Sequence, residues 1–163
     1  MRIEEGAPGG SRQILTWKIG DRLFGMDIGH CREVDKDKKI VAVPHSRKEV
    51  AGIVNLRGDV VTVIDLRVLL GDSKPVVADE ETAGDGATSV IIRLKCRNQH
   101  VALRADSIYD VINVTRDQFE GTPAHLSEIE ARYIQSVAMT AKGLVVILNP
   151  DEILRGSSND GNR

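Results

Sequence analysis

The sequence predicts a mainly β protein: two small barrels of about five strands each, packed on a shared apolar core, with only short helices. Many short segments alternate apolar and polar residues, a pattern typical of half-buried strands. Glycine, asparagine and aspartate recur between these segments, where hairpin turns need them. The segment order of the first half also returns in the second. A unit of about 70 residues is marginal alone, so two units sharing a core are expected.

In the first half, a glycine-rich tail at residues 1–13 is expected to be disordered. Alternation then predicts a hairpin over residues 14–28 with a bent continuation. A charged loop at 35–39 and a short strand at 40–43 follow, and Pro44 ends that strand because proline lacks the N–H that strand pairing needs.

The most patterned stretch is VAGIVNLRGDVVTVIDLRVLLG, from Val50 to Gly71. Its two β-branched runs flank Gly58-Asp59, which predicts a type II′ hairpin turn with glycine first. In that register Leu56 pairs with Val61, Asn55 with Thr62 and Val54 with Val63. One face of the hairpin is then apolar and must be buried; it consists of Val54, Leu56, Val61 and Val63.

The opposite face of this hairpin is mixed and ends in a polar tip at Asn55 and Arg57. Asp65 follows the second strand and is expected to cap a short helix at 66–70, with Gly71 ending it in the left-handed conformation. Capping is a simpler role for Asp65 than catalysis, because the carboxylate precedes unpaired helix N–H groups.

The second half begins after an acidic, glycine-containing segment that marks an internal boundary. Strand patterns run from Val90 to Val114, Ser127 and Glu130 fit a capping box, and a hairpin is predicted over 133–148. The expected divisions are a folded domain at 14–155, a first subdomain at about 14–72, an acidic loop at 73–88, a second subdomain at about 89–155, a closing helix at about 150–155 and a disordered tail at 156–163.

Composition excludes several classes of protein. No apolar run approaches the roughly 18 residues that span a bilayer, and the N-terminus lacks an apolar signal segment, so a cytosolic location is expected. Cys31 and Cys96 are too few and too distant to indicate a disulfide scaffold, and are interpreted as free thiols. A net charge of −2 and 3% aromatic residues argue against a nucleic-acid-binding β-barrel, which stays as an alternative from another class.

No catalytic or metal-binding motif is found in the sequence, so we expect neither an enzyme nor a cofactor. The histidines are scattered, and His30 and Cys31 are neighbours whose side chains would point to opposite faces of a strand. Arg57 has two interpretations: a solvated arginine at a hairpin tip, or a contact for another protein, since arginine is common at interface hot spots.

The patterned stretch resembles the central signature of the CheW family, the coupling proteins of bacterial chemotaxis, whose form is GxxNLRGxxxPVIDLR. LTWKIGDRLFGMDIGHCREV is similar to the family's opening hairpin and next strand, SVIIRLKCRNQHVALRADSIYDVINV to its second-half opening, and LVVILNPDEIL to its closing strand and helix. The resemblance covers about residues 14–155.

This resemblance implies two SH3-like barrels without enzymatic activity, in a cytoplasmic adaptor recruited to membrane-associated receptor arrays. It would couple the cytoplasmic tips of chemoreceptors, the methyl-accepting chemotaxis proteins, to the regulatory domain of the histidine kinase CheA. Other CheW copies in array rings are a further implied partner; nucleic acid and direct membrane insertion are not implied. The implied receptor-binding residues are Cys31, Glu33, Val34, Gly52, Asn55 and Arg57. The kinase-binding surface is not assigned to residues.

Three departures from the family pattern concern specificity. Thr62 replaces the usual proline, Cys31 stands where an aliphatic residue is typical, and the loop after Val34 is short and lysine-rich. They leave open which receptors are recognised. A regulatory module of a non-motility chemosensory pathway therefore stays as an alternative, as does the same module inside a kinase or a fused coupling protein, although no kinase or receiver motif is found in this sequence.

Overall fold

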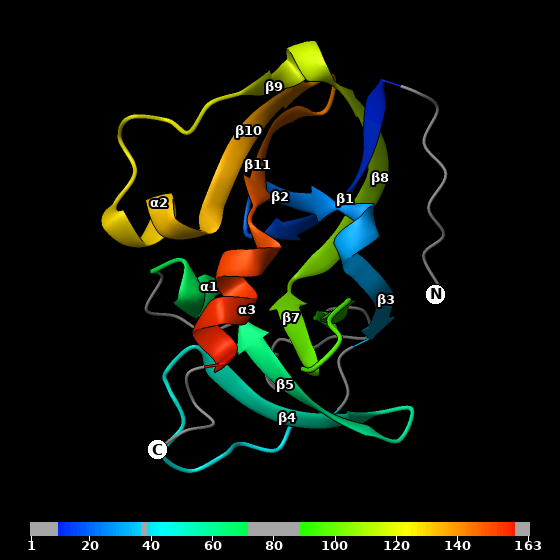
Figure 1. Cartoon of the computed structure of the whole chain (residues 1–163), viewed down its shortest axis with the longest axis vertical. Helices are drawn as coiled ribbons and strands as arrows, with labels where there is room; N and C mark the ends of the chain where they lie inside the picture. The colour runs from blue at the N-terminus through cyan, green and yellow to red at the C-terminus, as the bar shows by residue number, and fades with distance from the viewer. Residues whose placement is uncertain (1–9, 37–38, 72–88, 159–163) are drawn as a thin grey trace.

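The computed structural model describes residues 10–36, 39–71 and 89–158 (Figure 1). Strands dominate this part of the chain, as predicted. The elements in order are β1 (Ser11–Ile19), β2 (Arg22–Asp27), η1 (Ile28–His30), β3 (Cys31–Lys36), β4 (Val50–Leu56), β5 (Asp59–Asp65), α1 (Leu66–Leu69), β6 (Val90–Leu94), β7 (Val101–Ala105), β8 (Ser107–Thr115), η2 (Arg116–Gln118), β9 (Phe119–Glu120), α2 (Glu128–Tyr133), β10 (Ile134–Thr140), β11 (Gly143–Leu148) and α3 (Pro150–Ser158).

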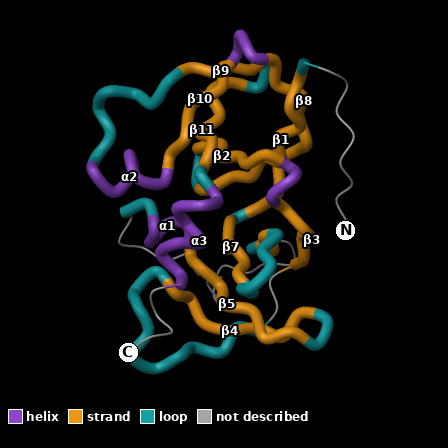
Figure 2. The backbone as a smooth tube through the Cα atoms, in the orientation of Figure 1, coloured by secondary structure: helices purple, strands orange, loops and turns teal. Residues whose placement is uncertain are grey.

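These strands form two sheets. The larger sheet has six strands in the order β8-β1-β2-β11-β10-β9, and the smaller sheet has five in the order β3-β6-β7-β5-β4. The larger sheet occupies the upper half of Figure 1 and the smaller sheet the lower half (Figures 1 and 2). Within the described residues, backbone pairing closes neither sheet into a barrel, because each sheet has two end strands.

The sheets do not follow the expected division into 14–72 and 89–155. The N-terminal hairpin β1–β2 joins the C-terminal strands, since β2 pairs in parallel with β11. The hairpin β6–β7 instead joins β3, β4 and β5, since β7 pairs in parallel with β5. Each sheet thus takes one hairpin from the other half of the chain. Alternating strand patterns are alike on both sheets, so they do not specify this exchange.

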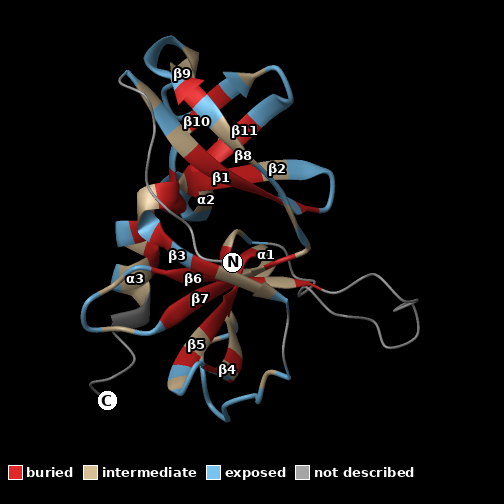
Figure 3. Ribbon diagram, turned by 90° about the vertical axis from the view of Figure 1, so that its right-hand side faces the viewer, coloured by how far each residue is buried: buried red, intermediate tan, exposed pale blue. Residues whose placement is uncertain are grey.

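Three apolar clusters stabilise this arrangement. The shared core lies between the sheets and includes Trp17, Phe24 and Met26 from the larger sheet and Ile64 and Leu103 from the smaller sheet. Each sheet also curls around a cluster of its own. Figure 3 shows buried residues along the strands of both sheets and exposed residues in the turns that connect them. The predicted shared apolar core is therefore confirmed, and each sheet is barrel-like in packing.

The predicted caps are confirmed in the structure. The Asp65 carboxylate accepts hydrogen bonds from the N–H groups of Arg67 and Val68 and so begins α1, and Gly71 follows with a φ of +94°. Ser127 and Glu130 form the expected capping box of α2. These polar groups satisfy backbone N–H groups that the short helices leave without an intrahelical partner.

Three boundaries differ from the sequence prediction. β1 begins at Ser11, inside the expected tail, and α3 continues to Ser158. The expected strand at 40–43 is a single bridge between Val41 and Ile53, in which each residue's N–H donates to the other's carbonyl. The predicted acidic loop and the outer parts of both tails lie outside the described residues.

Candidate protein-interaction site

The β4–β5 hairpin turns one residue earlier than predicted. Leu56 pairs with Asp59 and Asn55 with Val60, so the two-residue loop is Arg57-Gly58. Both loop residues have positive φ, +53° and +89°, as a type I′ turn requires. The Asn55 side-chain oxygen accepts a hydrogen bond from the Gly58 N–H at 3.0 Å, which stabilises this turn.

The predicted apolar face survives this change of register. Val54, Leu56, Val61 and Val63 are all buried in the cluster that the smaller sheet encloses. Moving the turn by one residue changes each cross-strand partner by two positions, and side chains alternate with a period of two, so every side chain keeps its face. The turn is therefore the part of the hairpin that sequence reasoning placed incorrectly.

Arg57 is exposed but held in place. Its side chain is 61% exposed, while its Nε lies 3.1 Å from Oε2 of Glu33, whose side chain is only 5% exposed. A non-glycine residue in the left-handed region costs roughly 1–2 kcal/mol, so the surrounding structure must favour this conformation. The bond to Glu33 uses one edge of the guanidinium and leaves the side chain mostly in solvent.

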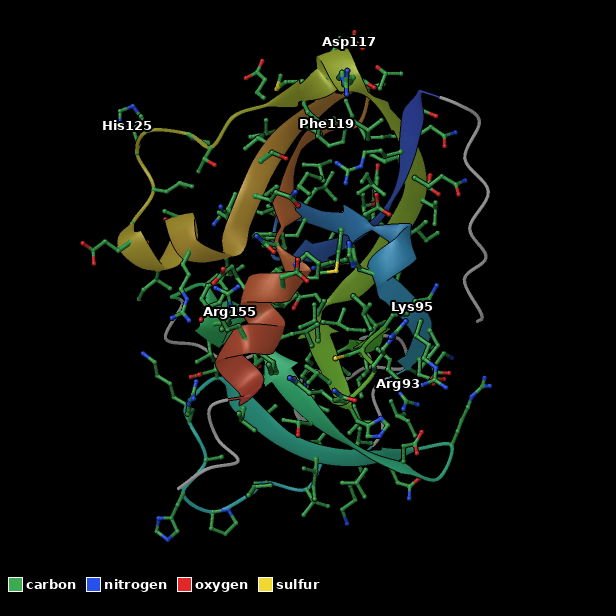
Figure 4. The ribbon with its side chains drawn as sticks, viewed as in Figure 1. Arg93, Lys95, Asp117, Phe119, His125 and Arg155 are labelled. Atoms are coloured by element: carbon green, nitrogen blue, oxygen red, sulfur yellow. The ribbon has the colours of Figure 1, made fainter. Side chains whose placement is uncertain are left out.

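Behind this pair lies a buried arginine, Arg93 on β6, labelled in Figure 4. Its side chain is 2% exposed, and its Nη1 lies 3.2 Å from Oε1 of Glu33. Its Nη2 donates to Oδ2 of Asp59 at 2.8 Å and to Nδ1 of His100 at 2.9 Å. Glu33, Arg57, Asp59, Arg93 and His100 are called the charge network below.

The contacts within the charge network shift the pKa values of Arg93 and Asp59. Burial lowers the pKa of Arg93, but the hydrogen bonds to Asp59 and Glu33 outweigh that effect and raise it above its usual value. The hydrogen bond from Arg93 lowers the pKa of Asp59, and nearby His100 and Arg32 act in the same direction. Arg93 and Asp59 are therefore both ionised near neutral pH.

The charge network lies at one end of the small cluster enclosed by the smaller sheet. Glu33 pairs with Arg93 across β3 and β6, and Arg93 pairs with Ala102 across β6 and β7. Directly paired residues share a face, and Ala102 belongs to the enclosed cluster, so Glu33 and Arg93 point toward that interior. The Glu33–Arg57 bond thereby ties the β4–β5 turn to β3, at the opposite end of the sheet.

The other face of the hairpin carries exposed apolar side chains near its tip. Val60 is 60% exposed, and Val41, bridged to Ile53, is 58% exposed. Asn55 pairs with Val60 on this face, and Ile53 is partly buried beside them. Exposed apolar side chains next to an anchored arginine are typical of a protein-interaction surface.

The structure places the six implied receptor-binding residues at different depths. Asn55 and Arg57 are exposed, and Val34 is partly buried against the shared core. Glu33 is buried in the charge network. Cys31 is fully buried, and burial, with the nearby Asp27, raises the pKa of its thiol to about 12. Cys31 therefore cannot contact another protein in this conformation.

Gly52 has a packing role that the sequence did not reveal. Its φ is +151°, and a Cβ atom at this position would collide with the Val41 carbonyl and the Ile40 side chain. Glycine here lets the segment before β4 lie close to the strand and form the Val41–Ile53 bridge. Gly52 is itself buried, so it supports the exposed surface from behind.

Sequence reasoning missed Arg93, Asp59 and Val60. The available signal was Arg93 itself, a lone charge inside the apolar run Val90–Leu94, because a charge on a buried strand needs an opposite charge nearby. Among the described residues, no group of histidine, cysteine and acidic side chains could hold a metal ion. In the same residues, no helix is long and apolar enough to cross a membrane.

Comparison with known proteins decides the family. The CheW-like domain family model matches residues 13–158. The chain belongs to the CheW-like domain family. This family consists of scaffolds and adaptors that are generally non-catalytic. The sequence-based identification is thus confirmed, as is the mainly β fold with two subdomains.

Individual relatives agree with this assignment. The "Probable chemotaxis protein CheW" of Rhizobium etli is 28% identical over 151 residues, which are 93% of this chain and 92% of the relative. The "Chemotaxis protein CheW" of Thermotoga maritima is 25% identical and covers 87% of both chains. The solved structure of the scaffolding protein TtCheW from Thermoanaerobacter tengcongensis superposes with a TM-score of 0.71 at 27% identity, over 85% of this chain and 89% of that one.

Proposed function

We propose that this CheW-like protein is a non-catalytic cytoplasmic adaptor that couples chemoreceptors, the methyl-accepting chemotaxis proteins, to the histidine kinase CheA. The observation that carries the proposal is Arg57: an arginine in a left-handed turn, mostly exposed, and bonded through Nε to a buried glutamate. Such an arginine loses little conformational freedom when it binds, which is the property expected of an interface anchor.

In this proposal the receptor contacts Asn55, Arg57 and the exposed apolar side chains of Val60 and Val41. The remaining implied residues act indirectly. Glu33 holds the Arg57 side chain through their ion pair, Gly52 lets the segment that carries Val41 pack close to β4, and the buried Cys31 packs in the core at the start of β3. Val34 is partly buried against the shared core, on the opposite face of β3 from Glu33. An apolar patch with a central arginine suits a helical receptor tip that presents an apolar stripe.

The second partner is the regulatory domain of CheA, and other CheW copies in array rings are a third. We assign no residues to these contacts. The same surfaces would serve a chemosensory pathway with an output other than motility, so the pathway's output has to be measured in cells.

The receptor site is tested with Arg57→Asn. Asn-Gly is a favoured type I′ turn sequence, so this variant should keep the turn, and its turn preference should offset part of the stability lost with the Glu33 ion pair. It loses the guanidinium, so binding to a purified receptor cytoplasmic fragment should weaken at least about tenfold, or about 1.4 kcal/mol. Arg116→Asn, on the exposed η2 turn, is the matched control and should bind normally.

Binding is measured by biolayer interferometry with the receptor fragment immobilised, and stability by urea unfolding. Equal affinity of wild type and Arg57→Asn would refute the assignment of Arg57 to the interface. Coupling needs a second measurement: wild-type protein should stimulate CheA autophosphorylation only when receptor is present. A chain that binds receptor fragments but never recruits CheA would refute the coupling role.

A further inference from the structure

The two carboxylates of the charge network, Glu33 and Asp59, are already paired with arginines within the protein. Both Glu33 oxygens are paired, one with Arg57 at 3.1 Å and the other with Arg93 at 3.2 Å. Asp59 accepts from Arg93 at 2.8 Å. These two carboxylates neutralise the buried Arg93 and part of the charge of Arg57, so they offer little negative charge to a partner.

Cationic groups at the same place are exposed. Arg32 lies on β3 beside Glu33, and its side chain is exposed. It lies close enough to Asp59 to lower the pKa of that carboxyl. Lys95 lies on the same side of the molecule as Arg93, beside β3 (Figure 4). Arg32 and Arg57 are thus both exposed near Glu33 or Asp59, in a chain whose net charge is −2.

The hairpin tip separates this charged side from the apolar side. Asp59 points into the charge network, and Val60, the next residue on β5, points to the opposite face. A partner seated on the tip therefore meets Arg57, bonded to Glu33, on one side and Val60 on the other, with the exposed Arg32 on β3 beside Glu33. Complementary charge on one side fixes orientation and raises the association rate more than it raises affinity.

We infer that the surface formed by Arg32 and Arg57 takes an acidic segment of the receptor tip, and that this contact sets the direction in which the receptor lies across the hairpin. The inference rests on the proposed function and adds the chemistry of the partner and the role of Arg32. The Arg32 side chain is exposed, so its charge is available for recognition.

The first test needs no receptor. A deca-glutamate peptide is titrated into ¹⁵N-labelled protein, and amide shifts are followed by NMR. We expect shifts confined to β3, the β4–β5 turn and the β6–β7 turn, and we expect 300 mM NaCl to suppress them, because exposed charges are screened at that ionic strength. Arg32→Glu should abolish these shifts, whereas Arg116→Glu, an equal charge change on η2, should not.

The second test uses the receptor fragment. Arg32→Glu should weaken its binding about tenfold at 50 mM NaCl and flatten the salt dependence, with Arg32→Gln between it and the wild type. Peptide shifts spread over the surface, or equal effects of the Arg32 and Arg116 reversals, would overturn the inference while leaving the adaptor role intact. Local peptide shifts without any receptor binding would support the cationic site and refute the adaptor role instead.

Discussion

The buried Arg93–Glu33 pair makes the sharpest prediction for stability. The Arg93 side chain is 2% exposed and has three partners: Glu33, Asp59 and His100. Arg93→Met removes the guanidinium and leaves Glu33 buried, with only the largely exposed Arg57 to compensate it. Breaking a buried pair by deleting one partner costs about 3–5 kcal/mol. Arg57 offsets a little of this, so we expect a loss near about 3 kcal/mol.

Glu33→Leu should cost less, about 1–3 kcal/mol, because Arg93 keeps Asp59 and His100 as partners. The double variant Glu33→Leu/Arg93→Met should be more stable than Arg93→Met alone. It leaves no buried charge behind, since Asp59 is 41% exposed and can be solvated. A double variant with a higher free energy of unfolding than Arg93→Met would show that the single substitution leaves an unpaired buried charge.

The assay is urea unfolding followed by circular dichroism, with the slope m compared among variants so that free energies refer to one unfolding reaction. Arg116→Met on the exposed η2 turn is the control and should change stability by less than about 0.5 kcal/mol. A cost for Arg93→Met below about 1 kcal/mol, or a double variant no more stable than Arg93→Met, would refute the assignment of Arg93 as a buried, paired charge.

Three further predictions follow from single features of the structure. Gly52→Ala should destabilise the protein by about 2 kcal/mol or more, measured by the same urea assay, because the new Cβ collides with the Val41 carbonyl; Gly121→Ala, with open space around it, is the control. Because burial raises the pKa of the Cys31 thiol to about 12, one thiol per native chain should react with a colorimetric disulfide reagent at pH 8, and two after unfolding. The Cys31 thiol loses its proton less readily in the folded than in the unfolded chain, so it stabilises the fold below pH 9, and this contribution is lost as the pH rises toward 12. Cys31→Ala should remove this loss of stability at high pH. Fragments 1–72 and 89–163 should each lack a fixed fold by NMR and become structured when mixed, since each sheet needs a hairpin from the other half.

Local patterns in the sequence predicted the elements and their faces well. The buried face of the β4–β5 hairpin was assigned correctly because alternation fixes parity, and Asp65 was assigned correctly because a cap needs only its own first turn. The turn type was wrong because Arg57 occupies a left-handed conformation that non-glycine residues seldom adopt. Local statistics place glycine at that position instead.

Pairing between distant segments could not be read in the same way. The parallel contacts β2–β11 and β5–β7 join apolar strands of similar composition, so the exchange of hairpins leaves no mark in the sequence. The family resemblance indicated which residues belong to the site but not how far each residue is buried. It therefore grouped Arg57, which is exposed, with Cys31, which is buried, and left out Arg93, which holds the group together.

The charge network explains why a buried ion pair is useful at this point of the fold. An apolar pair in place of Glu33 and Arg93 would fill the end of the small cluster and cost no desolvation. It would leave Arg57 without a partner on β3, and an unanchored arginine side chain must lose roughly 0.5–1.5 kcal/mol of rotamer freedom each time it binds. Glu33 can hold Arg57 only if its own burial is compensated, and Arg93 supplies that compensation from the next strand. The buried pair therefore lets the rigid sheet hold the exposed Arg57 guanidinium in a fixed direction.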